Sequence, residues 1–212
     1  MVWVKICGTT SLEDAQAAVD ADADALGFIF AEGPRRVAPL VARDIVRSLP
    51  ERIEKIGVFV NETVERIREI ALETGLTAVQ LSGYRSLDVL AKLKTEPGLQ
   101  LIPVYRMPTV PDSELFDFGR FDRVLFDTAV EGKHGGSGRT WDWESGKAAI
   151  ALLNGHVKVV VAGGLTPVNV ADAVRILHPW GVDVSSGVEC EPGKKDHEKV
   201  RAFVNAAKNA QV

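Results

Sequence analysis

One carboxylate stands where a buried strand is expected to end. The apolar run Val124–Phe126 leads into Asp127, and a loop rich in glycine follows, with Gly132, Gly135, Gly136 and Gly138. Taking a carboxylate out of water is costly unless it is hydrogen-bonded or protonated. Asp127 is therefore a candidate for chemistry, and the alternative is an Asp that caps a helix or anchors a loop.

A thiol occupies the equivalent place after the first apolar run. Cys7 follows Val4, Lys5 and Ile6, and Gly8 leads into an expected helix. The start of a helix can lower the pKa of a thiol. The alternative is that Cys7 is a small buried apolar residue, and the residues do not distinguish a thiol from a thiolate.

Two successive loops near the C-terminus have the composition of a phosphate site. Each follows an apolar run, and small residues let backbone N–H groups approach phosphate oxygens closely. The expected phosphate-binding residues are Gly163, Gly164, Leu165, Ser185, Ser186 and Gly187. Tight turns alone are the alternative explanation for these loops.

Charged residues near these loops give weaker signals. Arg35 or Arg36, in the segment AEGPRRVAP, could bind a substrate carboxylate through a guanidinium fork, although an arginine in such a loop is often simply solvated. Lys5 alternates with its neighbours in a strand and could point away from the interior, so it is left unassigned. The four histidines lack the spacing of metal ligands. No metal and no organic cofactor is expected.

The elements that must position these residues repeat along the chain. Eight short apolar runs alternate with helical segments, as in a parallel sheet whose strands are buried on both faces. Expected helix starts are Thr10, Asn61, Asp142, Thr166 and Asp196. The regular period and the absence of a linker predict one (β/α)8 TIM barrel, formed as a single domain by residues 1–212. A doubly wound sheet is the alternative.

The segment after the sixth run is the longest connection and is expected to act as a lid over the mouth of the barrel. Its glycine-rich centre consists of Gly135, Gly136, Ser137 and Gly138.

Composition narrows the classes of function. The net charge of -4 argues against general nucleic-acid binding but leaves room for a single bound phosphate. The sequence has neither an apolar run long enough for a membrane span nor a signal-peptide layout at its start, so we expect a cytoplasmic protein that does not bind membranes. Two cysteines form no disulfide framework.

Several longer motifs lie in order over essentially the whole chain. They are VKICGTTSLEDA, GVFVN, AVQLSG, LFDT, GGSGRTWDW, AGGLTPVNV, DVSSGVE and PGKKDHEKV. Together they resemble the motifs of the phosphoribosylanthranilate isomerase family of tryptophan biosynthesis. The resemblance implies an Amadori rearrangement of N-(5-phosphoribosyl)anthranilate, a small phosphosugar, to the 1-amino-1-deoxyribulose 5-phosphate. Ser82 departs from the pattern, because the family commonly has His there.

The resemblance also implies roles for individual residues. Cys7 would be the general base and Asp127 the general acid, and the loops at Gly163–Leu165 and Ser185–Gly187 would hold the phosphate. Arg35, or Arg36 beside it, would hold the anthranilate carboxylate.

Two other functions remain open at this point. One is the histidine-pathway isomerase, which performs the same rearrangement on another phosphoribosyl compound but typically has Asp in the place of Cys7. The other is a phosphosugar-binding barrel without catalysis, which would need neither Cys7 nor Asp127. A monomer and a homodimer both suit the pattern.

Overall fold

Eight parallel strands close into one barrel in the order of the chain. The computed structural model describes residues 1–83, 93, 98–107, 121–128 and 142–210. The strands are β1 (Trp3–Cys7), β2 (Ala25–Ile29), β3 (Glu54–Val60), β4 (Ala78–Ser82), β5 (Gln100–Met107), β6 (Arg123–Thr128), β7 (Lys158–Val161) and β8 (Gly181–Val184). Because β8 pairs with β1, the sheet has no open edge. The expected TIM barrel is confirmed and a doubly wound sheet is excluded.

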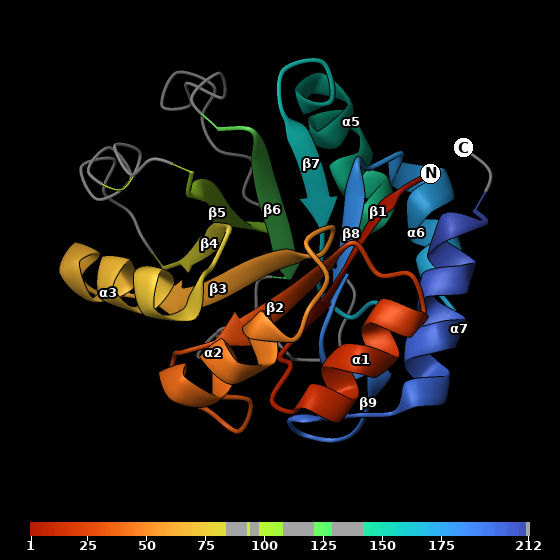
Figure 1. The fold of residues 1–212 in the computed structure, drawn as a ribbon. Helices are drawn as coiled ribbons and strands as arrows, with labels where there is room; N and C mark the ends of the chain where they lie inside the picture. Colours follow the sequence, from red (N-terminus) through yellow and green to blue (C-terminus); the bar gives the residue numbers. More distant parts are fainter. Residues whose placement is uncertain (84–92, 94–97, 108–120, 129–141, 211–212) are drawn as a thin grey trace.

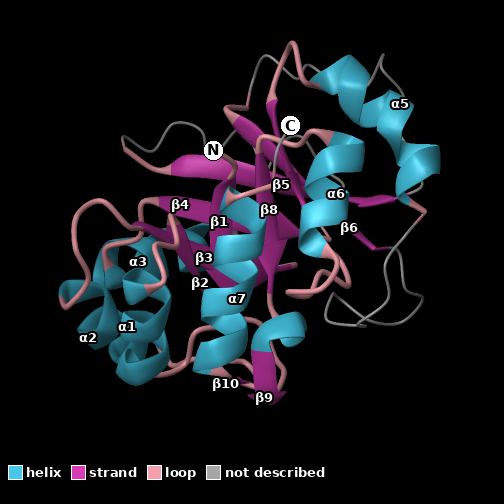
Figure 2. Cartoon of the chain, turned by 90° about the vertical axis from the view of Figure 1, so that its right-hand side faces the viewer, coloured by secondary structure: helices cyan, strands magenta, loops and turns pink. Residues whose placement is uncertain are grey.

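Helices cover the outside of the barrel (Figure 1). They are α1 (Leu12–Asp20), α2 (Pro39–Arg47), α3 (Val64–Thr74), α5 (Trp143–Leu153), α6 (Val170–Leu177) and α7 (His197–Lys208). After β8 the chain forms a short turn of helix, η2 (Ser186–Val188), and a hairpin of β9 (Glu189–Glu191) and β10 (Lys194–Lys195), which lies at the start of α7 (Figure 2). None of the helices in the described ranges is both long and apolar enough to cross a membrane.

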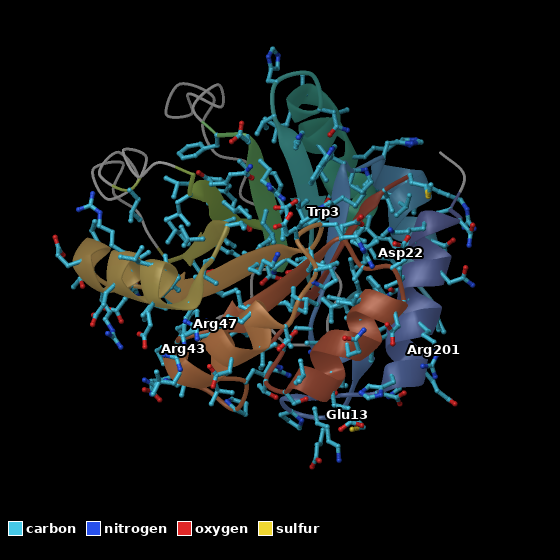
Figure 3. All side chains as sticks on the ribbon, viewed as in Figure 1. Trp3, Glu13, Asp22, Arg43, Arg47 and Arg201 are labelled. Atoms are coloured by element: carbon cyan, nitrogen blue, oxygen red, sulfur yellow. The ribbon has the colours of Figure 1, made fainter. Side chains whose placement is uncertain are left out.

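The strands are apolar on both faces because each face packs against other side chains. Inside the barrel, the apolar side chains are Ala25, Ile56, Ala78, Ile102, Leu125, Val160 and Ala162. A larger cluster, which includes Val4, Phe28 and Phe126, fills the space between strands and helices. Charged side chains such as Glu13, Arg47 and Arg201 are exposed on the helices that cover this cluster (Figure 3).

Arg123 and two tryptophans close the end of the barrel where the strands begin. The rings of Trp3 and Trp180 stack with centroids 5.1 Å apart, and the guanidinium of Arg123 lies 5.1 Å from the ring of Trp3. Arg123 is buried and also pairs with Glu54. This arrangement stabilises the floor of the barrel and leaves the opposite end for chemistry.

Some helices begin one to three residues later than the sequence predicts. Asp142 and Asp196 cap α5 and α7 as expected. However, Ser11 rather than Thr10 caps α1, Thr63 rather than Asn61 caps α3, and Asn169 rather than Thr166 precedes α6. Asn61 has a φ of 50°, a left-handed conformation that is incompatible with the extended backbone typical of an N-cap.

Candidate active site

The thiol of Cys7 lies inside the barrel at the end of β1. Cys7 is only 5% exposed and is paired in register with Gly27 of β2. A Cβ atom on Gly27 would lie 2.8 Å from Sγ of Cys7 and 3.0 Å from Cε of Lys5. The absence of a side chain at Gly27 therefore gives both residues room on the same side of the sheet.

Lys5, which was left unassigned from the sequence, points into the barrel and not away from its interior. Residues two apart in a strand face the same side, so Lys5 shares the interior face with Cys7. Its Nζ lies 2.8 Å from Oε1 of Gln80 and 2.9 Å from Oδ1 of Asp183. Lys5 is 1% exposed, so a fully buried cation is located one layer below the thiol.

The β9–β10 hairpin brings a second buried lysine to the end of β1. Nζ of Lys195 donates hydrogen bonds to the carbonyl oxygen of Cys7 at 2.6 Å and to Oε1 of Glu189 at 3.0 Å. The hairpin also packs on the loop after β1, because Thr10 donates a hydrogen bond to the carbonyl of Gly193. The segment after β8 is therefore part of the mouth of the barrel.

Arg35 lies at this mouth, whereas Arg36 lies in solvent. Arg35 donates from Nε and Nη2 to the carboxylate of Glu189. A Cβ on Gly8, the residue after Cys7, would lie 3.0 Å from Cδ of Arg35, so the arginine is close to the end of β1. Arg36 forms an ion pair with Glu32, and both side chains are more than half exposed. Of the two arginines, Arg35 is the one that the fold directs to the site.

Burial and charge act against each other on the titratable groups of this site. Burial raises the pKa of the Cys7 thiol overall, and the cations Lys5 and Lys195 offset only part of this rise. Burial alone would raise the pKa of Glu189, but hydrogen bonds from Arg35 and Lys195 outweigh burial and lower it. Burial lowers the pKa of Lys195 despite its contact with Glu189. The ionisation of each group therefore depends on its neighbours.

Asp127 lies near the end of β6, on the same face of the strand as the interior residue Leu125. It is partly exposed, as expected at the mouth of a barrel. In the closed order of strands, β7 and β8 separate β6 from β1, so Asp127 and Cys7 come from different sides of the mouth. Ser82 ends β4 at the same mouth.

The expected lid residues, Gly135, Gly136, Ser137 and Gly138, lie outside the residues that the structure describes.

The two loops expected to bind phosphate are in contact. Gly163 and Gly164 adopt φ values of 92° and 67°, which favour glycine. A Cβ on Gly187 would lie 1.9 Å from the carbonyl oxygen of Leu165, so only glycine lets the loops after β7 and β8 pack backbone to backbone. Within the described residues, Oγ of Ser185 is buried and has no hydrogen-bond partner. This hydroxyl lies close to Gly8, since a Cβ on Gly8 would be 3.1 Å from it.

A pocket of about 730 Å³ opens beside these loops. Its lining includes Gly164, Leu165, Ser186 and Gly187 together with Lys199 of α7. The pocket therefore involves four of the six residues expected to bind phosphate.

The charged residues around the thiol were not predicted from the sequence. They are Lys5, Asp183, Glu189 and Lys195. The alternation of β1 could have placed Lys5 inside the barrel. No local pattern links it to Asp183, which is 178 residues away.

A closed parallel barrel with its polar side chains at the carboxyl ends of the strands defines a (β/α)8-barrel enzyme. The model of one family, described as N-(5'phosphoribosyl)anthranilate (PRA) isomerase, matches residues 4–206. The chain belongs to this family.

Full-length relatives agree with this assignment. The N-(5'-phosphoribosyl)anthranilate isomerase of Pelobacter propionicus is 45% identical over 212 residues, which cover 100% of this chain and 98% of the relative. The isomerase of Bacillus cereus is 42% identical over 97% of each chain. The crystal structure of phosphoribosyl anthranilate isomerase from Thermotoga maritima is 37% identical, with a TM-score of 0.87 over 98% of this chain and 99% of that one.

A solved structure of a phosphoribosyl anthranilate isomerase holds reduced 1-(o-carboxyphenylamino)-1-deoxyribulose 5-phosphate. It is 37% identical, with a TM-score of 0.84 over 98% of this chain and 99% of that one.

Proposed function

We propose that this chain isomerises N-(5'-phosphoribosyl)anthranilate to the 1-amino-1-deoxyribulose 5-phosphate in tryptophan biosynthesis, with Cys7 as general base and Asp127 as general acid. Family membership is the observation that carries the activity. It decides against the histidine-pathway isomerase and against a barrel that only binds. The roles of the two residues are our proposal, and the placement of both at the carboxyl end of the barrel supports it.

The rearrangement needs two proton transfers. In the first, the carboxylic acid of Asp127 protonates the ring oxygen of the furanose, and the ring opens to a protonated Schiff base. In the second, the thiolate of Cys7 removes the proton from C2, and the electrons of the C–H bond form an enolamine, which tautomerises to the ketone. Each acid or base step contributes roughly 100- to 10,000-fold to the rate.

Arg35 and the two glycine-rich loops are proposed to bind the ends of the substrate. Glu189 engages Nε and Nη2 of Arg35, and the described residues offer no partner for Nη1, which could bind the anthranilate carboxylate. The loops at Gly163–Leu165 and Ser185–Gly187 would bind the phosphate through backbone N–H groups and the unpaired hydroxyl of Ser185. The substrate would then lie across the mouth, between Cys7 and Asp127.

Turnover of the substrate itself tests the proposed activity. Freshly prepared phosphoribosylanthranilate is mixed with the purified protein, and the change in anthranilate fluorescence is followed. We expect rapid consumption, and Cys190→Ala, a change of the exposed thiol, should leave the rate unchanged. A folded protein that binds the product analogue without consuming substrate would contradict the activity.

Assembly and location remain predictions. A relative from Thermotoga maritima is described as dimeric, so we propose a monomer or a homodimer for this chain. A sedimentation measurement at several concentrations distinguishes the two. We also propose that the protein is cytoplasmic.

A further inference from the structure

Lys5 is a buried cation near the proposed base, Cys7, but it takes part in neither of the proposed proton transfers. A fully buried ammonium is destabilising unless partners compensate for the lost water. Lys5 has two such partners, the carboxylate of Asp183 at 2.9 Å and the amide oxygen of Gln80 at 2.8 Å. The three side chains come from β1, β4 and β8, so the position of the ammonium is fixed from several sides of the barrel.

The register of β1 against β2 directs this cation toward the thiol. Cys7 pairs with Gly27, and a side chain at Gly27 would collide with both Sγ of Cys7 and Cε of Lys5. The aliphatic part of the Lys5 side chain and the thiol of Cys7 therefore both pack over the backbone of Gly27 in β2. Sγ of Cys7 and Cε of Lys5 both lie within 3.0 Å of the position that a Cβ on Gly27 would take. Both side chains are buried, and charge–charge interactions are strong where water is excluded.

Charged side chains converge on the thiol from several elements. The cations that face Cys7 are Lys5 on β1, Lys195 on β10 and Arg35 after β2, and the anions near them are Asp183 and Glu189. Farther out, the buried carboxylate of Asp14 contacts His197. Of these groups, Lys5 does most to offset the cost of ionising the buried thiol.

Lys5 is better suited than Lys195 to hold a thiolate. Burial lowers the pKa of both ammonium groups, but Asp183 and Cys7 more than compensate at Lys5, whose pKa is raised overall. At Lys195 the effect of burial is larger than that of the neighbouring anions, and the pKa is lowered. Lys195 also shares Glu189 with Arg35, so part of its charge is already neutralised.

We propose that Lys5 is a positioning residue for the base: its ammonium, held by Asp183 and Gln80, stabilises the thiolate form of Cys7. This inference rests on the proposed role of Cys7 in proton transfer. Lys5 keeps its own protons throughout. The C2 proton passes to Sγ, the electrons of the C–H bond enter the enolamine, and the ammonium then faces a neutral thiol until that proton leaves.

The test is a titration of Cys7 that does not depend on activity. In a Cys190→Ala background, the ultraviolet absorbance of the thiolate is measured against pH, and the same titration of Cys7→Ala is subtracted. Lys5→Met should raise the pKa of Cys7 by roughly one to three units, the range for loss of a nearby opposite charge. The value of kcat/KM at neutral pH should fall about tenfold for each unit. Asp183→Asn should shift the pKa the opposite way, because the Asp183 charge opposes ionisation of the thiol.

Two further variants keep the test decisive. Lys5→Met leaves Asp183 as an unpaired buried charge, so the double variant Lys5→Met/Asp183→Asn removes both charges of the pair together. It should still raise the pKa of Cys7. Lys55→Met removes another buried lysine, whose Nζ binds the carbonyl of Pro50, and should leave the titration unchanged.

An unchanged pKa of Cys7 in folded Lys5→Met and in the double variant would overturn the role of Lys5, even if Cys7→Ala is inactive. If Cys7→Ala instead turns over substrate at the wild-type rate, Cys7 is not the base, and the proposed role of Lys5 fails with it.

Discussion

Arg35 and Glu189, 154 residues apart in the chain, form an ion pair through two nitrogens and both carboxylate oxygens. Nε of Arg35 lies 2.8 Å from Oε1 of Glu189, and Nη2 lies 2.8 Å from Oε2. The pair fixes the plane of the guanidinium and fastens the loop after β2 to the β9–β10 hairpin. Glu189 also accepts a hydrogen bond from Lys195, so one carboxylate organises two cations at the mouth.

Glu189→Gln should destabilise the protein at neutral pH by roughly 3–5 kcal/mol, because the buried Lys195 and the partly buried Arg35 lose their shared anion. The lowered pKa of Glu189 means that its stabilising effect is present above its ordinary value of 4.5 and is lost as the pH falls through the folded-state value. Urea unfolding at neutral and at acidic pH should therefore show a difference between wild type and variant that shrinks in acid.

The control for Glu189 is Glu191→Gln on the same hairpin. Glu191 pairs with Lys194, and both side chains are 67% exposed. Glu191→Gln should therefore lower the free energy of unfolding by less than about 1 kcal/mol. Equal losses in the two variants would contradict the structural role of Glu189.

Arg35→Lys should raise KM and lower kcat/KM by roughly 10- to 100-fold, because an ammonium keeps the charge but not the planar fork. Arg36→Lys is the matched change at the exposed neighbour and should have little effect. Steady-state kinetics of both variants measure the difference. If Arg36→Lys lowers kcat/KM more than Arg35→Lys does, the substrate carboxylate binds to Arg36 and not to Arg35.

Gly187→Ala should weaken phosphate binding and lower the melting temperature. Its Cβ would lie 1.9 Å from the carbonyl of Leu165, so the loops after β7 and β8 must separate, at a cost of about 1–3 kcal/mol or more. Calorimetry with inorganic phosphate and a thermal melt measure the two effects. Gly155→Ala, whose Cβ would meet nothing within 4 Å, should change neither. Unchanged phosphate affinity in Gly187→Ala would argue against a phosphate site in these loops.

The barrel could be predicted from the sequence because each strand carries its own local signal. Eight short apolar runs were expected, and the barrel has eight strands, among them β3 (Glu54–Val60) and β8 (Gly181–Val184). Helix starts were less certain, since Thr10 and Ser11 can both cap a helix and the backbone conformation decides between them.

The arrangement around the thiol could be predicted only in part. Cys7 and Asp127 end apolar runs, so their position at the mouth follows from the fold. The partners of Lys5 and Arg35 come from the far end of the chain, at Asp183 and Glu189, and their side chains meet only after the barrel closes between β8 and β1. Local patterns carry no information about such contacts.

The most direct test of the account measures kcat of Cys7→Ala and Asp127→Asn on freshly prepared phosphoribosylanthranilate, with the affinity for reduced product measured on the same samples. Each variant should lose roughly 100- to 10,000-fold in kcat, while the dissociation constant of the reduced product changes little. If either folded variant turns over substrate at the wild-type rate, that residue does not transfer the proton and the assignment of base or acid is wrong.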